Sequence, residues 1–134
     1  MILAKANLDY TSFKSCDVSH SNAIKASFYE SVVDEVDFSN SEMMKASFMS
    51  STLSRTNFIN CKLTRASFKN SRLQDVDFSG ADLSDADFSN AQLSRVTFNG
   101  AYFNDKTTWP EHTDPTRTGA IRLEEGERDD HPTT

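Results

Sequence analysis

Large apolar residues recur at every fifth position over most of the chain. This phase, here called the centre position, begins at Leu3 and continues to Phe103, and all ten phenylalanines fall in it. The residue two places earlier is nearly always small, and two polar residues usually follow the large one. A period of five fits neither an α-helix nor a flat strand, whose periods are about 3.6 and 2. The pattern therefore predicts a repeat protein.

The five-residue unit suits one side of a square coil. Each unit offers two inward side chains, one large and one small, and then a polar pair suited to a bend. Four units close one coil, and successive coils stack at roughly the 4.8 Å spacing of neighbouring strands. Residues 20 apart should then be neighbours, and their charges agree with this, because the sign alternates along Glu35, Arg55, Asp75 and Arg95.

The repeat motif A-[DN]-[LF]-x-x is plainest in Ala81-Asp82-Leu83, Ala86-Asp87-Phe88 and Ala6-Asn7-Leu8. On these residues the chain resembles the pentapeptide-repeat proteins. The resemblance implies an all-β fold, a right-handed quadrilateral parallel β-helix of about five coils. The end of the chain is also similar to that of several bacterial members, through Thr107, Trp109, Pro110, Asp114, Pro115, Gly119 and Ala120.

Three segments are expected. Residues 1–105 form the β-helix, and Met1 is already in register without an N-terminal cap, so we expect a first coil that is either open or covered by something else. Residues 106–123 form a C-terminal capping segment in which Trp109, which has no place in the repeat, folds over the last coil together with Pro110. Residues 124–134 contain no apolar side chain and are expected to be an acidic disordered tail.

Charge and composition favour a cytoplasmic protein. Residues 1–105 hold 10 basic and 13 acidic side chains (net −3), and the remainder holds 4 and 7 (net −3), which together give −6. We find no signal peptide and no membrane span in the sequence. Cys16 and Cys61 both occupy the small inward position, so buried free thiols are expected rather than a disulfide or a metal site.

The sequence offers no catalytic constellation, so we expect a protein that is not an enzyme and has no cofactor. A filled square coil leaves no pocket for a substrate. The three histidines, His20, His112 and His131, lie far apart in register. The many aspartates occupy solvent-facing positions of the repeat, not convergent pairs of the kind that acid–base catalysis uses.

Two surface features are candidates for binding a partner. Ile24, Met44, Tyr29 and Met49 follow the centre residue, where polar residues usually stand, and should form one exposed patch around a corner of the second and third coils. The alternative is that bends tolerate apolar residues without a function. The second feature is a column of like charge at 20-residue spacing: Lys5, Lys25, Lys45 and Arg65. It favours an anionic partner, or else the long side chains simply spread into solvent, which is the interpretation we prefer.

These observations predict a protein–protein interaction scaffold of unknown partner. A homodimer could form through the N-terminal coil or through the Met/Tyr patch. The alternative rests on the resemblance: some family members protect DNA gyrase or topoisomerase IV from quinolones or toxins by imitating duplex DNA. We rank it second, because the solenoid carries only −3 over roughly 25 Å, whereas DNA carries one charge per 1.7 Å. Direct nucleic-acid or membrane binding is not expected.

Overall fold

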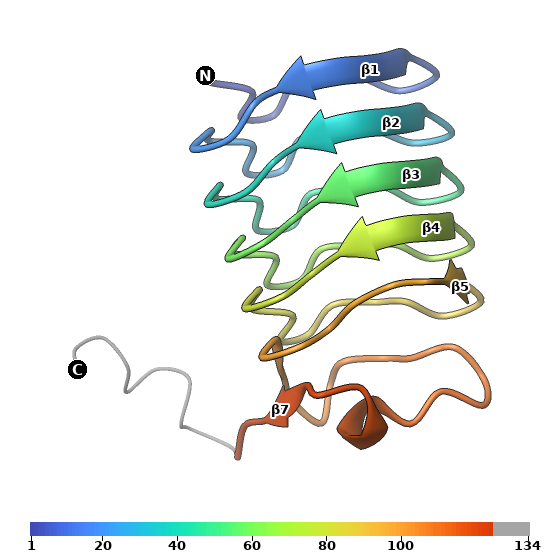
Figure 1. Ribbon diagram of the computed structural model, residues 1–134. Helices are drawn as coiled ribbons and strands as arrows, with labels where there is room; N and C mark the ends of the chain where they lie inside the picture. Colours follow the sequence, from blue (N-terminus) through green and yellow to red (C-terminus); the bar gives the residue numbers. More distant parts are fainter. Residues whose placement is uncertain (125–134) are drawn as a thin grey trace.

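The computed structural model describes residues 1–124 and shows a parallel β-solenoid (Figure 1). The tail expected at the C-terminus lies, from residue 125 on, outside the described residues. One parallel sheet contains, in chain order, β1 (Ser12–Asp17), β2 (Val32–Asp37), β3 (Thr52–Asn57), β4 (Arg72–Asp77) and β5 (Gln92–Ser94). Its register joins residues 20 apart, such as Leu53 with Leu73. The 20-residue coil is therefore confirmed.

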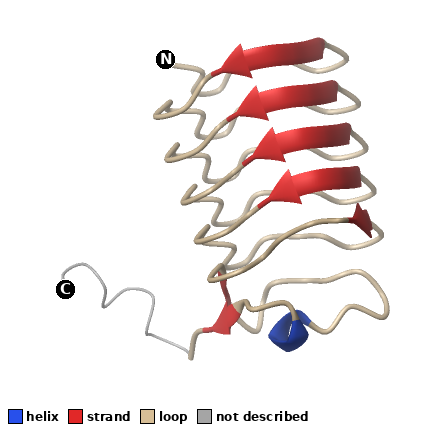
Figure 2. Cartoon of the chain, viewed as in Figure 1, coloured by secondary structure: helices blue, strands red, loops and turns tan. Residues whose placement is uncertain are grey.

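Each coil has four walls joined by four corners. In the first coil the walls are residues 1–3, 6–8, 11–13 and 16–18, and they are called the first to fourth walls in every coil. Strands β1 to β4 run along the third and fourth walls, and the other two walls pair through single parallel bridges, drawn as loop in Figure 2. The long strands form on this side of the coil because the corner between the third and fourth walls keeps its place in the parallel sheet, so one strand continues across both walls.

Every corner contains a residue with left-handed backbone. The φ angle is positive at each fifth position from Lys5 (61°) to Gly100 (73°), and only two of these positions, Gly80 and Gly100, hold glycine. A non-glycine residue in this conformation costs about 1–2 kcal/mol in isolation. The second residue of each predicted bend is therefore strained, and hydrogen bonds to the next coil hold it in place, such as Lys25 N–H to the Met44 carbonyl at 2.9 Å.

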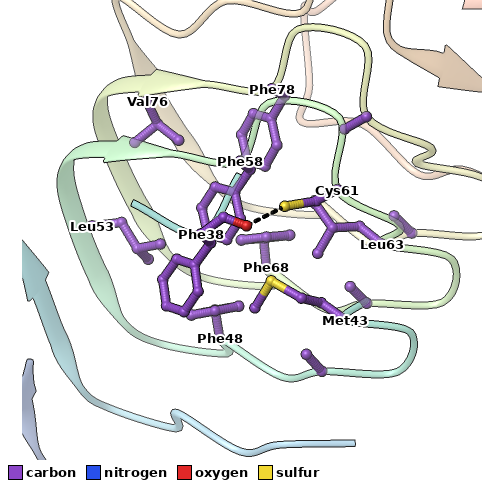
Figure 3. Close-up of a cluster of buried hydrophobic side chains, with 14 of the residues drawn as sticks. Phe38, Met43, Phe48, Leu53, Phe58, Cys61, Leu63, Phe68, Val76 and Phe78 are labelled. Carbon is purple, nitrogen blue, oxygen red and sulfur yellow. Dashed lines mark hydrogen bonds between the residues drawn. The ribbon is translucent and has the colours of Figure 1, made fainter. Parts of the chain in front are cut away.

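The core contains two columns of stacked phenylalanine rings among its aliphatic side chains (Figure 3). Within each column the ring centroids lie 4.6–5.3 Å apart and the planes are within 6° of parallel. Rings of different columns meet edge to face at 5.3–5.9 Å. Both geometries are favourable for aromatic pairs. The columns are Phe28, Phe48, Phe68, Phe88 and Phe38, Phe58, Phe78, Phe98.

The solenoid has about six coils, so the expectation of about five was too low. The added coil uses irregular registers: Asp87 pairs with Thr108, one residue beyond the usual spacing, and β6 (Tyr102–Phe103) pairs with β7 (Ile121–Arg122), one residue short of it. A single 3-10 turn, η1 (Pro115–Arg117), lies between them. The fivefold phase is lost after Phe103, which hid this coil from the sequence pattern.

Trp109 has a place in the core after all. Its ring stacks on Phe88 at 5.4 Å and 8°, so it extends the Phe28 column by one member. It also meets Phe98 and Phe103 edge to face, at 5.2 and 5.5 Å. The indole Nε1 is buried without a hydrogen-bond partner among the described residues, so ring packing alone orients the side chain. Pro110 follows it, half-buried.

Candidate functional site

The four apolar residues proposed for a partner surface lie along one wall rather than around one corner. Ile24 and Met44 stand at the corner before the second wall, and Tyr29 and Met49 stand at the corner after it. Residues five apart necessarily fall at successive corners of a square coil, so the expected single-corner patch was misplaced. All four side chains are half-buried, not exposed as expected.

The wall between these corners is flat and carries small hydroxyl side chains. Its outward residues in the second, third and fourth coils are Ser27, Ser47 and Ser67, joined by parallel bridges at 20-residue spacing. We call this wall, together with its two flanking corners, the serine face.

Tyr10 extends the serine face to the first coil. Its side chain is 70% exposed, and its ring meets Tyr29 edge to face at 5.7 Å. Asp9 fixes this corner, because its Oδ1 accepts a hydrogen bond from the Tyr29 N–H at 2.9 Å. A hydrogen bond with Glu30 raises the pKa of the Tyr29 phenol above its ordinary value of 10. Tyr10 stands one place later in the repeat than Tyr29, so it lies outside the repeat position that predicted the apolar patch.

The basic column runs along one edge of the serine face. Lys5, Lys25, Lys45 and Arg65 all occupy the left-handed second residue of the corner that also carries Ile24 and Met44, and all four are exposed. Arg65 forms an ion pair with Asp85, with Nε and Oδ2 3.6 Å apart. In the part of the chain that the structure describes, the three lysines have no carboxylate within ion-pair distance.

Three aspartates, Asp17, Asp37 and Asp77, lie on the fourth wall, opposite the serine face. Each Oδ1 accepts a hydrogen bond from a backbone N–H two residues later, at Ser19, Ser39 and Ser79, over 2.8–3.0 Å. For Asp17 the bonds from Ser19 hold the pKa of the carboxyl below its ordinary value. These aspartates therefore form side-chain turns that fix the corners. The sequence signal for these turns is an Asp before and a Ser after the centre residue, which recurs at all three positions.

Charges on neighbouring coils do pair, although not always straight along the column. Arg95 and Asp75 pair at 20-residue spacing, with Nε and Oδ1 2.7 Å apart. Arg55 instead reaches diagonally to Asp34, where its Nη2 lies 2.7 Å from Oδ2, and not to Glu35. All these guanidinium groups are largely exposed, so each pair adds little to stability.

The two cysteines differ although they hold the same repeat position. Cys61 is buried in the fourth coil, its thiol donates to the Phe38 carbonyl at 2.9 Å (Figure 3), and burial raises its pKa to about 12. Cys16 lies in the first coil and is only half-buried, so the expectation of two buried thiols was wrong for Cys16. No disulfide joins them.

Residues 1–124 were searched for metal-ligand clusters and for membrane-spanning helices. They contain no cluster of three or more His, Cys, Asp or Glu side chains placed to hold a metal ion. Over the same residues, no helix has the length and apolar content that crossing a bilayer requires. The serine face with its basic edge is the arrangement that we carry forward as the candidate site.

The fold, the inward phenylalanine columns and the 20-residue register define a class of protein. A family model described as the pentapeptide repeat region matches residues 31–107, more than half of the chain. The chain belongs to the pentapeptide-repeat family. Members of this family are generally structural or interaction proteins rather than enzymes.

Solved structures support the same fold. The pentapeptide repeat protein alr5209 from Nostoc Pcc 7120 superposes with a TM-score of 0.73 at 24% identity, over 76% of this chain and 84% of its own. Rfr23 from the cyanobacterium Cyanothece 51142 gives 0.67 at 17% identity, over 77% and 87%. QnrB1, a plasmid-mediated fluoroquinolone resistance protein, gives only 0.31 at 14% identity, over 89% and 93%, which carries no argument. No curated protein matches the sequence.

Proposed function

We propose that this protein is a non-catalytic scaffold that binds a protein partner through the serine face. The observation that carries the proposal is the pairing of apolar and basic side chains on the second and third coils. Ile24 and Met44 stand beside Lys25 and Lys45, and Tyr29 and Met49 line the opposite edge. Methionine and tyrosine are suited to adaptable protein contacts.

The charge of this face indicates the chemistry of the partner. Three lysines without an ion-pair partner in the described chain stand next to an apolar column. A partner segment that presents acidic and apolar side chains together would satisfy both, and charge complementarity would speed its association. Rigidity supports the same role, because stacked coils hold the face in one conformation and little freedom is lost on binding.

The test compares two double variants. Met44→Asp with Met49→Asp replaces two apolar side chains of the serine face by acids, whereas Thr64→Asp with Asn70→Asp adds the same charge at polar positions of the same two corners one coil later. Proteins captured from the cells that express this chain are quantified for wild type and both variants. We expect at least one captured protein to lose about tenfold or more in affinity for the first variant only. Equal capture by all three chains would refute the proposal.

A gyrase assay separates this function from DNA mimicry. The column of lysines along the serine face and the use of Asp17, Asp37 and Asp77 in turns both argue against an imitation of the phosphate backbone. We therefore expect micromolar protein to leave DNA supercoiling by gyrase unchanged, with and without a fluoroquinolone. Inhibition or protection would replace the scaffold proposal with the DNA-mimic one.

A further inference from the structure

The outer edge of the first coil carries unused strand hydrogen-bonding groups. In the second coil, Asn22 N–H donates to the Met1 carbonyl at 3.0 Å, and the Asn22 carbonyl accepts from Leu3 N–H at 2.6 Å. The equivalent groups of the first coil point away from the second coil, where no described residue meets them. They belong to one residue on each wall: Ile2, Asn7, Ser12 and Asp17. Such an edge is a template for pairing with another chain.

The core is also open at this edge. Leu3, Leu8 and Phe13 are half-buried, whereas the centre residues from Phe28 to Phe88 are fully buried. Met1 and Ile2 on the first wall are 66% and 82% exposed. Figure 1 shows the first coil uncovered at the N-terminal end of the solenoid. A partner seated here would bury apolar side chains and pair backbone groups at the same time.

Charges around the edge favour a second copy of this chain. Lys5, Asp9 and Lys14 stand at or beside three successive corners, and Asp17 precedes the fourth. Basic and acidic side chains therefore alternate around the square. When an identical coil is turned over by a two-fold axis across the solenoid, its chain runs in the opposite direction, so facing walls become antiparallel strands. Residues whose N–H and C=O both face the partner can then exchange two hydrogen bonds.

The charges also select the axis. An axis through the first and third walls places Ile2 against Ile2 of the other copy, Ser12 against Ser12, and Asn7 against Asp17. Asp9 then lies across from Ser15 of the other copy, one residue from Lys14. Asp9 Oδ1 is occupied by Tyr29 N–H within its own chain, which leaves Oδ2 to reach Lys14 of the other copy. An axis through the second and fourth walls would place Asp9 across from Lys5, but it would also place Asp17 against Asp17, a like-charge pair that destabilises adjacent strands.

We infer that the first coil docks head to head onto the first coil of a second copy, about the axis through the first and third walls. The two solenoids then form one continuous rod with the four edge N–H groups of each chain paired. This surface is distinct from the serine face, so the scaffold function and the dimer can succeed or fail separately.

Cysteine trapping tests the axis. Ser12→Cys in a Cys16→Ser chain should cross-link to a dimer when copper phenanthroline oxidises the two thiols. Antiparallel hydrogen-bonded residues lie about 5.5 Å apart at Cα, within disulfide range. Thr52→Cys, in the same column two coils later, is the matched control and should stay monomeric. Cross-linking of Asn7→Cys in place of Ser12→Cys would overturn the proposed axis.

Association in solution tests the edge itself. Sedimentation of the unmodified chain, starting at Met1, should show a species of twice its 15.0 kDa mass that grows with concentration. Ile2→Lys brings two like charges together on the axis and should weaken association about tenfold or more, while Asn22→Lys in the same column should not. Ile2 is exposed, so the variant should fold normally. A monomer at all concentrations, or equal association of both variants, would overturn the inference.

Discussion

The two ends of this solenoid are finished in different ways. At the C-terminal end Trp109 stacks on Phe88 and meets Phe98 and Phe103, so the aromatic core ends against a closed surface. At the N-terminal end Phe13 meets Phe28 and Phe38 at longer distances, 5.9 and 6.2 Å, and remains half-exposed. Figure 1 shows the same contrast in the backbone, since the segment with η1 and β7 covers one end only.

The contrast teaches how a β-helix can be closed. The covering ring is not a separate element placed over the core. It is the next member of a phenylalanine column, reached by a one-residue change of register between Asp87 and Thr108. An end without such a change repeats the open edge of any coil, and it stays able to pair.

Thiol labelling should give the largest difference between the ends. Cys61 lies inside the stack, with a pKa raised to about 12 by burial, whereas Cys16 holds the same repeat position in the open first coil. We expect Cys16 to react with a disulfide reagent about a thousandfold faster or more, because the thiolate is the reactive form and Cys61 must also be uncovered. The rates are measured in dilute native protein, with urea-unfolded protein as control. Similar native rates would show that the interior coils open as readily as the first.

Removing one ring from each end should give the next largest effect. Trp109→Ala deletes a side chain in contact with three rings, and we expect a loss of about 2–4 kcal/mol in the free energy of unfolding. Phe13→Ala should cost less, about 1–2 kcal/mol, because its ring is already partly in water. Urea unfolding followed by far-UV circular dichroism measures both. A larger loss for Phe13 would mean that the first coil is covered in solution, as in the proposed dimer, and dilution would then reduce it.

Two corner glycines compare a crowded corner with an open one. Both have left-handed backbone, so alanine should cost about 1–2 kcal/mol at either. A Cβ on Gly80 would also lie 2.2 Å from Asn60 Oδ1, whereas on Gly100 its nearest neighbour is the Gly80 nitrogen at 3.9 Å. We expect Gly80→Ala to cost more than Gly100→Ala by about 0.5–1 kcal/mol. In a double-mutant cycle with Asn60→Ala the excess should disappear; an unchanged excess would place its cause in the backbone.

The ion pairs should give the smallest effect. Among residues 1–124 they join later coils, as Arg95 joins Asp75, and none involves the first coil. The hydrogen bond from Arg95 lowers the pKa of Asp75 below its ordinary value of 3.8. Because the folded pKa is the lower one, the stabilisation is present above pH 3.8 and is lost as the pH falls through the folded pKa.

Asp75→Asn should therefore reduce stability slightly at neutral pH, and the difference from wild type should vanish in strong acid. Denaturant unfolding at pH 7, 4 and 2 measures the difference. Glu35→Gln, in the same column but without an Arg55 ion pair, is the control and should show a smaller dependence on pH. A difference that grows towards low pH would contradict the assignment.

The regular part of the fold could be predicted from the sequence, because one apolar phase fixes both the inward face and the coil length. Phe28, Phe48 and Phe68 lie stacked as their 20-residue spacing requires. The sixth coil could not be predicted, because a single shift of register removes Trp109 from the phase that would have revealed it. The coil therefore still forms after the one-residue shift of register, although the fivefold apolar pattern is no longer present in the sequence.

The candidate site was less predictable than the fold. The 20-residue spacing selected Ile24, Met44, Tyr29 and Met49. Because a wall separates residues that are five apart, these side chains lie along two edges of one face and not at a single corner. Burial also differed, since all four side chains are half-buried and not exposed. The role of Asp77 in fixing a turn depends on the hydrogen bond that its Oδ1 accepts from Ser79 N–H. The sequence pattern indicated only that Asp77 is a charged surface residue. Whether the serine face binds a partner remains a prediction.

The 20-residue register also has a mechanical consequence. Hydrogen bonds between coils join adjacent coils, as Asn22 N–H joins the Met1 carbonyl and Ala23 N–H joins the Glu42 carbonyl. A pulling force applied at the N-terminus therefore loads one coil at a time and peels it from the next. Each released coil adds about 70 Å of extended chain. The rod should yield in equal steps under tension at its open end, with the final step resisting longest at Trp109.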